Sequence, residues 1–282
     1  MGRHVMEALG LCRVTVEDGS VVSVTKPLMD FCPMFAKMRG MEHLDTESVR
    51  RNIEFRIRDF GLFTENRQVR GNDIVTFGVS EILSYAIRQK KLDAACVVSD
   101  GCGSVIITDP EILQGLCGRI SGIIETSPLK VVQDAVGTEN ILDPVRCTID
   151  PIAVARKASE RGYDRIAVTV ARSADARSVR EILGDRGMIV GVHTSGMSRC
   201  DVDELFEYCD ITTACASGFI REKAFALKAE GKVEIAGNKV QIVAISDLGK
   251  ELVGDKLRSL GRDFWNGTPE TVDPIPFIDG NQ

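Results

Sequence analysis

The sequence has little of several features that would reveal a function directly. It contains three histidines, one tryptophan and 5% aromatic residues. No two of its cysteines have the CxxC spacing that is typical of zinc sites and redox motifs. It also lacks the GxGxxG pattern of dinucleotide-binding folds and the GxxxxGK[ST] pattern of P-loops. The sequence therefore gives no support for a dinucleotide site or a P-loop.

Long apolar runs and an excess of positive charge are also missing. The apolar stretches reach only strand length, as in residues 94–99, whereas a membrane span needs about 20 apolar residues. The net charge of −6 argues against nucleic-acid binding, which favours a basic surface. The first ten residues lack the apolar core of a secretion signal. We therefore expect a cytoplasmic protein that binds neither membranes nor nucleic acids.

What is present is an ordinary globular composition with an unusual number of thiols. Of 282 residues, 44% are hydrophobic and 27% are charged, which suits a protein with a sizeable core. The nine cysteines are an odd number in a long chain, whereas disulfide frameworks are typical of short secreted domains. These cysteines are therefore expected to be free thiols in a reducing compartment.

Local patterns predict an α/β fold. Asp18-Gly19, between two β-branched runs, predicts a β-hairpin over residues 11–26. After Leu142 the periodicity alternates regularly between strand and helix. The expected order is strand 165–171, helix 174–184, strand 188–194, helix 201–208, strand 210–216 and helix 218–229. This alternation favours mostly parallel sheets with helices on both faces and a Rossmann-like second half.

The same patterns suggest a division of the chain into three parts. Residues 143–150 interrupt the periodicity, so we expect an N-terminal α/β lobe with its hairpin over 1–146 and a Rossmann-like lobe over 147–261. Residues 262–282 contain Trp265 and three prolines and have no periodicity. They are expected to form an irregular tail that lies over the surface or over a partner.

Polar side chains gather where the strands of the second half end. Ligands of open α/β sheets bind beyond the carboxyl ends of the strands. Donors at helix N-termini can hold an anion there, although the same hydroxyls also serve as helix caps. A small anionic or phosphorylated ligand is therefore expected in contact with some of these residues. The candidates are Thr169, Arg172, Thr194, Ser195, Ser198 and Ser217.

Two residues are candidates for chemistry. His193 is suited to act as a general base or as a metal ligand beside Cys215, with a hydrogen bond to a loop carbonyl as the structural alternative. Cys102 lies between two glycines, which allow close approach and a nest of amides that lowers a thiol pKa. Cys102 is therefore a candidate nucleophile.

Three cysteines stand at expected loops rather than inside strands: Cys32, Cys102 and Cys215. If the fold brings them together, their thiolates suit a soft metal or an iron–sulfur cluster with one open position. The alternative is three separate buried thiols, because free cysteine packs as a small hydrophobic residue.

Five ordered strings resemble the methanogenesis marker protein 8 family of methanogenic archaea. They are DFCPMFAKMRG, RRNIEFRIRDFGLFT, SDGCGSVIITDPEILQGL, GRISGIIETSP and ITTACASGFIRE. The resemblance covers about residues 8–255, and the strings contain Cys32, Cys102 and Cys215. Cys117 stands where the family pattern has glycine, so it is not counted as functional.

The resemblance implies a cytoplasmic archaeal protein that serves methane metabolism. Its expected role is to help mature, activate or modify methyl-coenzyme M reductase or a related cofactor system, with a protein partner in that machinery. Three functions fit the residues: an accessory protein that holds a metal or iron–sulfur species, an enzyme acting on a small anionic ligand, and a non-catalytic assembly partner.

Overall fold

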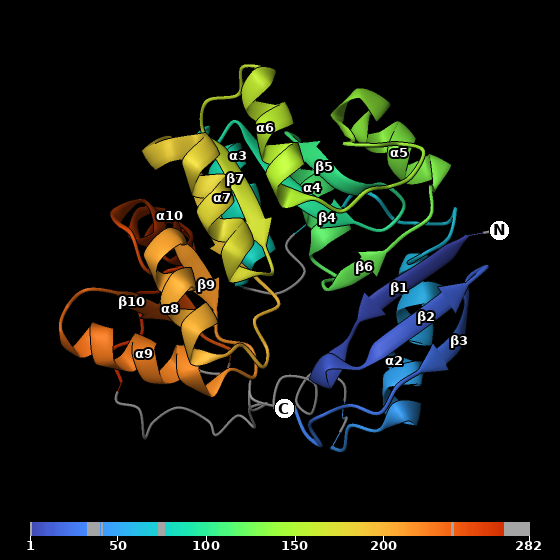
Figure 1. Cartoon of the computed structure of the whole chain (residues 1–282), viewed down its shortest axis with the longest axis horizontal. Coiled ribbons are helices and arrows are strands. Elements are labelled where there is room, and N and C mark those ends of the chain that lie inside the picture. The colour runs from blue at the N-terminus through green and yellow to red at the C-terminus, as the bar shows by residue number, and fades with distance from the viewer. Residues whose placement is uncertain (1, 33–39, 41, 73–76, 238–239, 268–282) are drawn as a thin grey trace.

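The computed structural model describes residues 2–32, 40, 42–72, 77–237 and 240–267 (Figure 1). The strands within these residues form two sheets, one of four strands and one of seven. Within these ranges, no helix is both long and apolar enough to cross a membrane.

The smaller sheet is antiparallel and has the strand order β3-β2-β1-β6. Its strands are β1 (Arg3–Glu7), β2 (Arg13–Glu17), β3 (Ser20–Val24) and β6 (Ile123–Glu125). The predicted hairpin is β2 and β3, and Asp18 and Gly19 form its turn with φ of 49° and 76°. Positive φ at both positions is what a type I′ hairpin turn requires. The sequence did not predict β1 or β6.

Helix α2 (Thr46–Phe60) covers one face of the smaller sheet. Asp45 begins the helix by accepting a hydrogen bond from the Ser48 amide, and Gly61 ends it in the left-handed conformation. Val49 and Ile53 point into a core that is shared with the strands. This sheet and helix make a compact unit beside the larger sheet (Figure 1).

The larger sheet has the strand order β10-β11-β9-β8-β7-β4-β5. Its central strands β4, β7, β8 and β9 are parallel, whereas β5, β11 and β10 add antiparallel edges. The bounds are β4 (Ala94–Ser99), β5 (Gly103–Ile107), β7 (Ile166–Val170), β8 (Met188–Gly191), β9 (Ile211–Thr213), β10 (Glu234–Ala236) and β11 (Ile242–Ala244). The mixed α/β class is confirmed. Because β4 and β5 belong to this sheet, it crosses the division expected at residue 146.

Helices cover both faces of the larger sheet. One core lies under α3 (Val79–Arg88), α4 (Pro110–Cys117), α5 (Lys130–Val136) and α10 (Asp247–Ser259). The other lies under α6 (Pro151–Glu160), α7 (Ser173–Leu183), α8 (Arg199–Tyr208) and α9 (Gly218–Ala229). Short 3-10 turns occur at Leu9–Leu11, Thr138–Asn140 and Gly184–Arg186. The expected helices on both faces are therefore present.

The beginning of the expected tail packs against the protein itself. The Trp265 ring lies 5.4 Å from the Phe225 ring of α9. Its backbone N–H donates to the Ile235 carbonyl at 2.7 Å. Trp265 thus extends the core on this face, while residues 268–282 of the expected tail lie outside the described residues.

A buried ion pair joins the two sheets. Asp100, in the turn between β4 and β5, accepts two hydrogen bonds from Arg67 Nε at 3.1 Å and one from the Phe63 amide at 2.9 Å. Both charged side chains are 0% exposed. Arg67 also donates to the carbonyls of Gln68 and Leu116. The loop after α2 is thereby fixed to the larger sheet and to α4.

His4 completes this joint from the smaller sheet. Its Nδ1 lies 2.7 Å from Thr126 Oγ1, which also accepts the Gly101 amide at 2.8 Å. The side chain is buried, and burial lowers the pKa of His4. A neutral imidazole at this position suits the apolar contact with Phe63, whose ring centroid is 5.0 Å away.

We expect the Arg67→Met variant to be strongly destabilised. Removing the guanidinium leaves the Asp100 carboxylate buried without a cation, which typically costs about 3–5 kcal/mol. Urea unfolding would measure the change in free energy. The matched control is Arg186→Met, because Arg186 pairs with Asp164 at the surface, with 74% and 56% of the two side chains exposed. The control should lose less than about 1 kcal/mol. Equal losses in the two variants would contradict this role for the buried pair.

Candidate functional site

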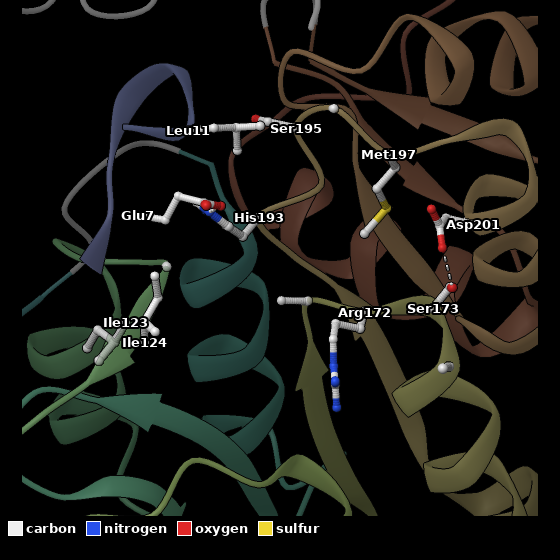
Figure 2. A pocket seen from close by; sticks show the side chains of 14 residues that line it. Glu7, Leu11, Ile123, Ile124, Arg172, Ser173, His193, Ser195, Met197 and Asp201 are labelled. Carbon is white, nitrogen blue, oxygen red and sulfur yellow. Dashed lines mark hydrogen bonds and ion pairs between the residues drawn. The ribbon is translucent and has the colours of Figure 1, made fainter. Parts of the chain in front are cut away.

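A cleft of about 510 Å³ lies between the two sheets, at the carboxyl ends of β7 and β8 (Figure 2). Strands β7 and β8 are adjacent and parallel, so the loops that follow them leave the sheet at the same edge. The opposite wall comes from the end of β1, the turn after it and the start of β6. The lining residues are Glu7, Leu11, Gly122, Ile123, Ile124, Ala171, Arg172, Ser173, Ala174, His193, Ser195, Gly196, Met197 and Asp201.

His193 and Glu7 contact each other at one end of the cleft. His193 Nε2 lies 2.8 Å from Glu7 Oε1, and the two side chains are 17% and 31% exposed. Figure 2 shows the two side chains in contact, although one comes from each sheet. The backbone of His193 has φ of 57°, a left-handed conformation that is costly for a residue with a side chain. The fold therefore holds this ring in place against a conformational preference.

Gly122 makes the contact between His193 and Glu7 sterically feasible. Its carbonyl accepts the Glu7 amide at 2.7 Å, which fixes the end of β1. A Cβ at this position would lie 2.3 Å from the Glu7 carbonyl oxygen and 2.7 Å from His193 Cε1. Its φ of 73° also favours glycine. A larger residue would displace the histidine, the strand end or both.

The other end of the cleft is a network of hydroxyls around Asp201. Ser198 donates to Asp201 Oδ2 at 2.6 Å, and Ser173 donates to Oδ1 at 2.9 Å. These hydrogen bonds, that from Ser198 foremost, hold the pKa of Asp201 below its ordinary value. The carboxylate is therefore charged at neutral pH and sits at the positive N-terminus of α8.

The first turn of α7 lines the cleft beside this network. Residues 172–174 are part of the lining, and α7 begins at Ser173 without a side-chain cap on its amides. Arg172 forms two hydrogen bonds with Asp175, at 2.9 Å and 2.7 Å, while its side chain stays 76% exposed. An uncapped helix N-terminus next to an exposed guanidinium favours an anionic group.

The remaining wall is apolar. It consists of Leu11, Ile123, Ile124 and Met197. Of these, Ile124 exposes 44% of its surface, which is high for a large aliphatic residue. The cleft thus has an apolar side, a histidine–carboxylate pair at one end and a hydroxyl-rich helix start at the other.

Three of the predicted residues line the cleft: Arg172, His193 and Ser195. His193 lies next to a carboxylate, not the loop carbonyl that was its structural alternative. Sequence reasoning missed Glu7 and Gly122, because β1 and β6 have no pattern that links them to the Rossmann-like half.

The other predicted hydroxyls contact the protein itself. Thr169 donates to the Cys96 carbonyl at 3.5 Å, and Thr194, fully buried, donates to the Thr213 carbonyl at 2.6 Å. Ser198 caps α8, and Ser217 caps α9 by accepting the Ile220 amide. The contacts of Ser198 and Ser217 are therefore those of helix caps, which was the alternative to ligand binding for these hydroxyls.

Cys102 differs from the expectation of an accessible nucleophile. It is 0% exposed and belongs to the core on the α4 side of the larger sheet. Burial, with a further contribution from Asp100, raises the pKa of the Cys102 thiol well above its ordinary value. Cys117 and Cys147 are close enough to contribute as well. A buried thiol that stays protonated is a poor nucleophile.

The three thiols expected to share a metal do not come together. Cys32 packs against the apolar cluster that contains Ala216, the residue after Cys215, whereas Cys102 is in the separate core around Cys117 and Cys147. Among the residues that the structure describes, no three His, Cys, Asp or Glu side chains are placed to hold one metal ion. The reason is topological: Cys102 turns inward at the end of β4, while Cys215 follows β9 at the far side of β7 and β8.

The fold and the cleft define an α/β protein with a cleft at the carboxyl ends of two parallel strands. Residues 4–258 match the family described as "Uncharacterized protein conserved in archaea (DUF2099)". The chain belongs to this family. A protein of Methanocaldococcus jannaschii named "Uncharacterized protein MJ0054" is 42% identical over 287 residues, which cover 100% of this chain and 98% of the relative. Every residue that lines the cleft lies inside the span matched by the family.

We expect the Gly122→Ala variant to separate His193 from Glu7. The new methyl group would overlap the Glu7 carbonyl and the His193 ring, so the nuclear magnetic resonance signals of the His193 ring should shift. Urea unfolding should show a loss of about 1–3 kcal/mol from backbone strain, or more if the strand end moves. The matched control is Gly162→Ala. Gly162 also has a positive φ, 84°, but a Cβ at this position would have no neighbour within 4 Å. The control should lose stability and leave His193 unchanged. Unchanged His193 signals in Gly122→Ala would contradict the steric argument.

Alkylation of the native protein should distinguish the cysteines by exposure. Cys200 is exposed and should react first with iodoacetamide, as followed by peptide mass mapping. Cys96, whose pKa burial raises to about 12, and Cys102 should react only after unfolding. The Cys200→Ser variant should lose the fast phase. Labelling of Cys102 as rapid as that of Cys200 would restore it as a candidate nucleophile.

Proposed function

We propose that the protein is an enzyme that binds a small anionic molecule in the cleft and uses His193 to transfer a proton on it. The observation that carries the proposal is the 2.8 Å contact between His193 Nε2 and Glu7 Oε1 inside the cleft. A carboxylate that holds one ring nitrogen fixes the orientation and the tautomer of the imidazole. Proton exchange with the bound molecule then falls to the other ring nitrogen, Nδ1.

The strained backbone of His193 supports a functional role. A left-handed conformation at a residue with a side chain costs on the order of 1–3 kcal/mol, and such residues cluster at active sites. Glycine or asparagine at position 193 would adopt this backbone more easily. The need for an imidazole at this point is a reason for keeping histidine there.

The lining indicates the class of ligand. A volume of 510 Å³ lies within the range of small-molecule sites, about 300–1,000 Å³. The uncapped start of α7 and the exposed Arg172 favour a carboxylate or phosphate. Leu11, Ile123 and Met197 favour an apolar body between that anionic group and His193. The charged Asp201 favours a hydroxyl or amine donor on the ligand and disfavours a second anionic group nearby.

A ligand screen followed by matched variants tests the proposal. Small mono-carboxylates and phosphate monoesters, compared with their neutral amide or alcohol analogues, would be screened by thermal shift. At a ligand concentration about 100 times the Kd, binding adds about 2.7 kcal/mol, which corresponds to a rise in Tm of about 5–10 °C for a chain of this size.

The hits would then be tested for proton exchange by deuterium incorporation from heavy water. His193→Gln should abolish the exchange and keep binding within a few fold, because the anionic group contacts α7. The matched control is His43→Gln, since His43 is exposed. The proposal fails if none of the anionic compounds binds, or if His193→Gln exchanges as fast as the control.

The sequence resemblance supports a metabolic role in which this chemistry would be used. The ordered strings described above resemble the methanogenesis marker protein 8 family, and from them we infer a role in methane metabolism. In that role the cleft would act on a small molecule needed to mature, activate or modify methyl-coenzyme M reductase or a related cofactor system. A deletion strain that makes normal, fully active methyl-coenzyme M reductase would contradict this setting and leave the chemistry of the cleft to be tested by itself.

A further inference from the structure

The second ring nitrogen of His4, Nε2, is buried without a hydrogen-bond partner. The side chain is 1% exposed, and no group in the part of the chain that the structure describes bonds to Nε2. The backbone of Gly2 lies against this nitrogen, since a Cβ at Gly2 would be 3.2 Å from it. Buried polar atoms without a partner are rare in folded proteins, so this one calls for an explanation.

The surroundings of the ring fit the neutral form that carries its hydrogen on Nδ1. Thr126 Oγ1, which is 2.7 Å from Nδ1, also accepts the Gly101 amide at 2.8 Å, and its own hydrogen can reach the Ser127 carbonyl at 3.4 Å. Nδ1 then donates to Oγ1, and Nε2 carries no hydrogen. Protonation would place a charge and a second N–H at Nε2, where the described residues offer no acceptor.

The charged groups around His4 are paired with one another. They are Arg3 of β1, Glu17 of β2, Arg67 of the loop after α2, Asp100 of the β4–β5 turn and Glu125 of β6. Asp100 pairs with Arg67, whereas Arg3 pairs with both glutamates. Burial lowers the pKa of His4, and the smaller effects of Asp100 and Glu125 oppose it without cancelling it. The folded protein therefore favours the uncharged ring.

Strand β1 is linked to the larger sheet at both of its ends. Near its start, His4 reaches the turn after β4 through Thr126 and the Gly101 amide. At its end, Glu7 contacts His193 in the loop after β8. An opening that brings water to Nε2 has to move the start of this five-residue strand, and the same strand carries Glu7 into the cleft.

We propose that His4 is an acid-sensitive joint that regulates the cleft: protonation of its ring loosens β1 from the β4–β5 turn and separates Glu7 from His193. The uncharged ring contributes its full stabilisation above about pH 6.5, the ordinary pKa of histidine. This contribution declines as the pH falls from there towards the lower pKa of the folded state. The proposal does not depend on the ligand or the reaction proposed for the cleft.

The first test is a nuclear magnetic resonance titration of the histidine rings in the full-length protein. The chain has three histidines, so the variants His4→Asn and His43→Asn assign the signals. We expect the His4 ring of the wild type to stay neutral well below pH 6.5. A His4 ring that titrates with its ordinary pKa in the folded protein overturns the proposal, whether or not the variants fold.

The second test locates the opening by hydrogen exchange of backbone amides. The reporters are the amides of Glu7 and Gly101, which donate to the Gly122 carbonyl and to Thr126. Their protection should fall by up to about 30-fold between pH 7.5 and 5.0, the limit for a histidine of pKa 6.5 that must be neutral in the closed state. Their exchange at pH 5.0 should depend little on low concentrations of urea, as is typical of local opening.

The matched variants and a reference amide decide the outcome. Asparagine at position 4 does not titrate, so folded His4→Asn should lose this pH dependence, whereas His43→Asn, altered at an exposed residue, should keep it. The reference is the Val168 amide in β7, which should exchange more slowly and with a steep dependence on urea. The proposal is overturned if His4→Asn keeps the pH dependence of the wild type. It is also overturned if Glu7 and Gly101 exchange only as Val168 does, through unfolding of the whole protein.

Discussion

The buried ion pair between Arg67 and Asp100 is the constraint on which the rest of the structure depends. Two opposite charges with no exposed surface are stable only if hydrogen bonds satisfy their remaining polar atoms. Asp100 achieves this with the Phe63 amide, and Arg67 achieves it with the carbonyls of Gln68 and Leu116. The partners come from the loop after α2, the β4–β5 turn and α4, so the pair can form only when these three segments are in their final positions.

The cleft depends on that fixed arrangement. Glu7 ends β1 of the smaller sheet and Gly122 directly precedes β6, whereas His193 lies in the loop that follows β8 of the larger sheet. A shift of about an ångström between the sheets would remove the contact between the histidine and the carboxylate, because hydrogen bonds weaken steeply beyond about 3.2 Å. The buried joint at Asp100 and His4 therefore serves the site, although neither residue lines the cleft.

Several parts of the site were predictable because they follow from local rules. The alternation of strands and helices after Leu142 placed Arg172, His193 and Ser195 at the carboxyl edge of a parallel sheet, and the structure places them in the cleft. The same reasoning also selected Thr194 and Ser217, whose hydroxyls satisfy the protein's own backbone. The sequence pattern around a hydroxyl at a strand end is the same whether it lines a cleft or bonds the protein's own backbone. Only the residues around it in the folded structure distinguish the two.

The sequence by itself determined the α/β class, the hairpin at Asp18-Gly19 and the edge of the sheet at which a ligand site could form. These features arise from periodicity, turn chemistry and connection rules, which act over a few residues or along one chain direction. Only the tertiary structure decided that Glu7 faces His193 and that Cys32 packs against the cluster of Ala216 while Cys102 lies in a separate core. Such contacts join residues separated by up to 186 positions. No local preference encodes them, because they result from how the two sheets pack around buried charges and a glycine that leaves room for a ring.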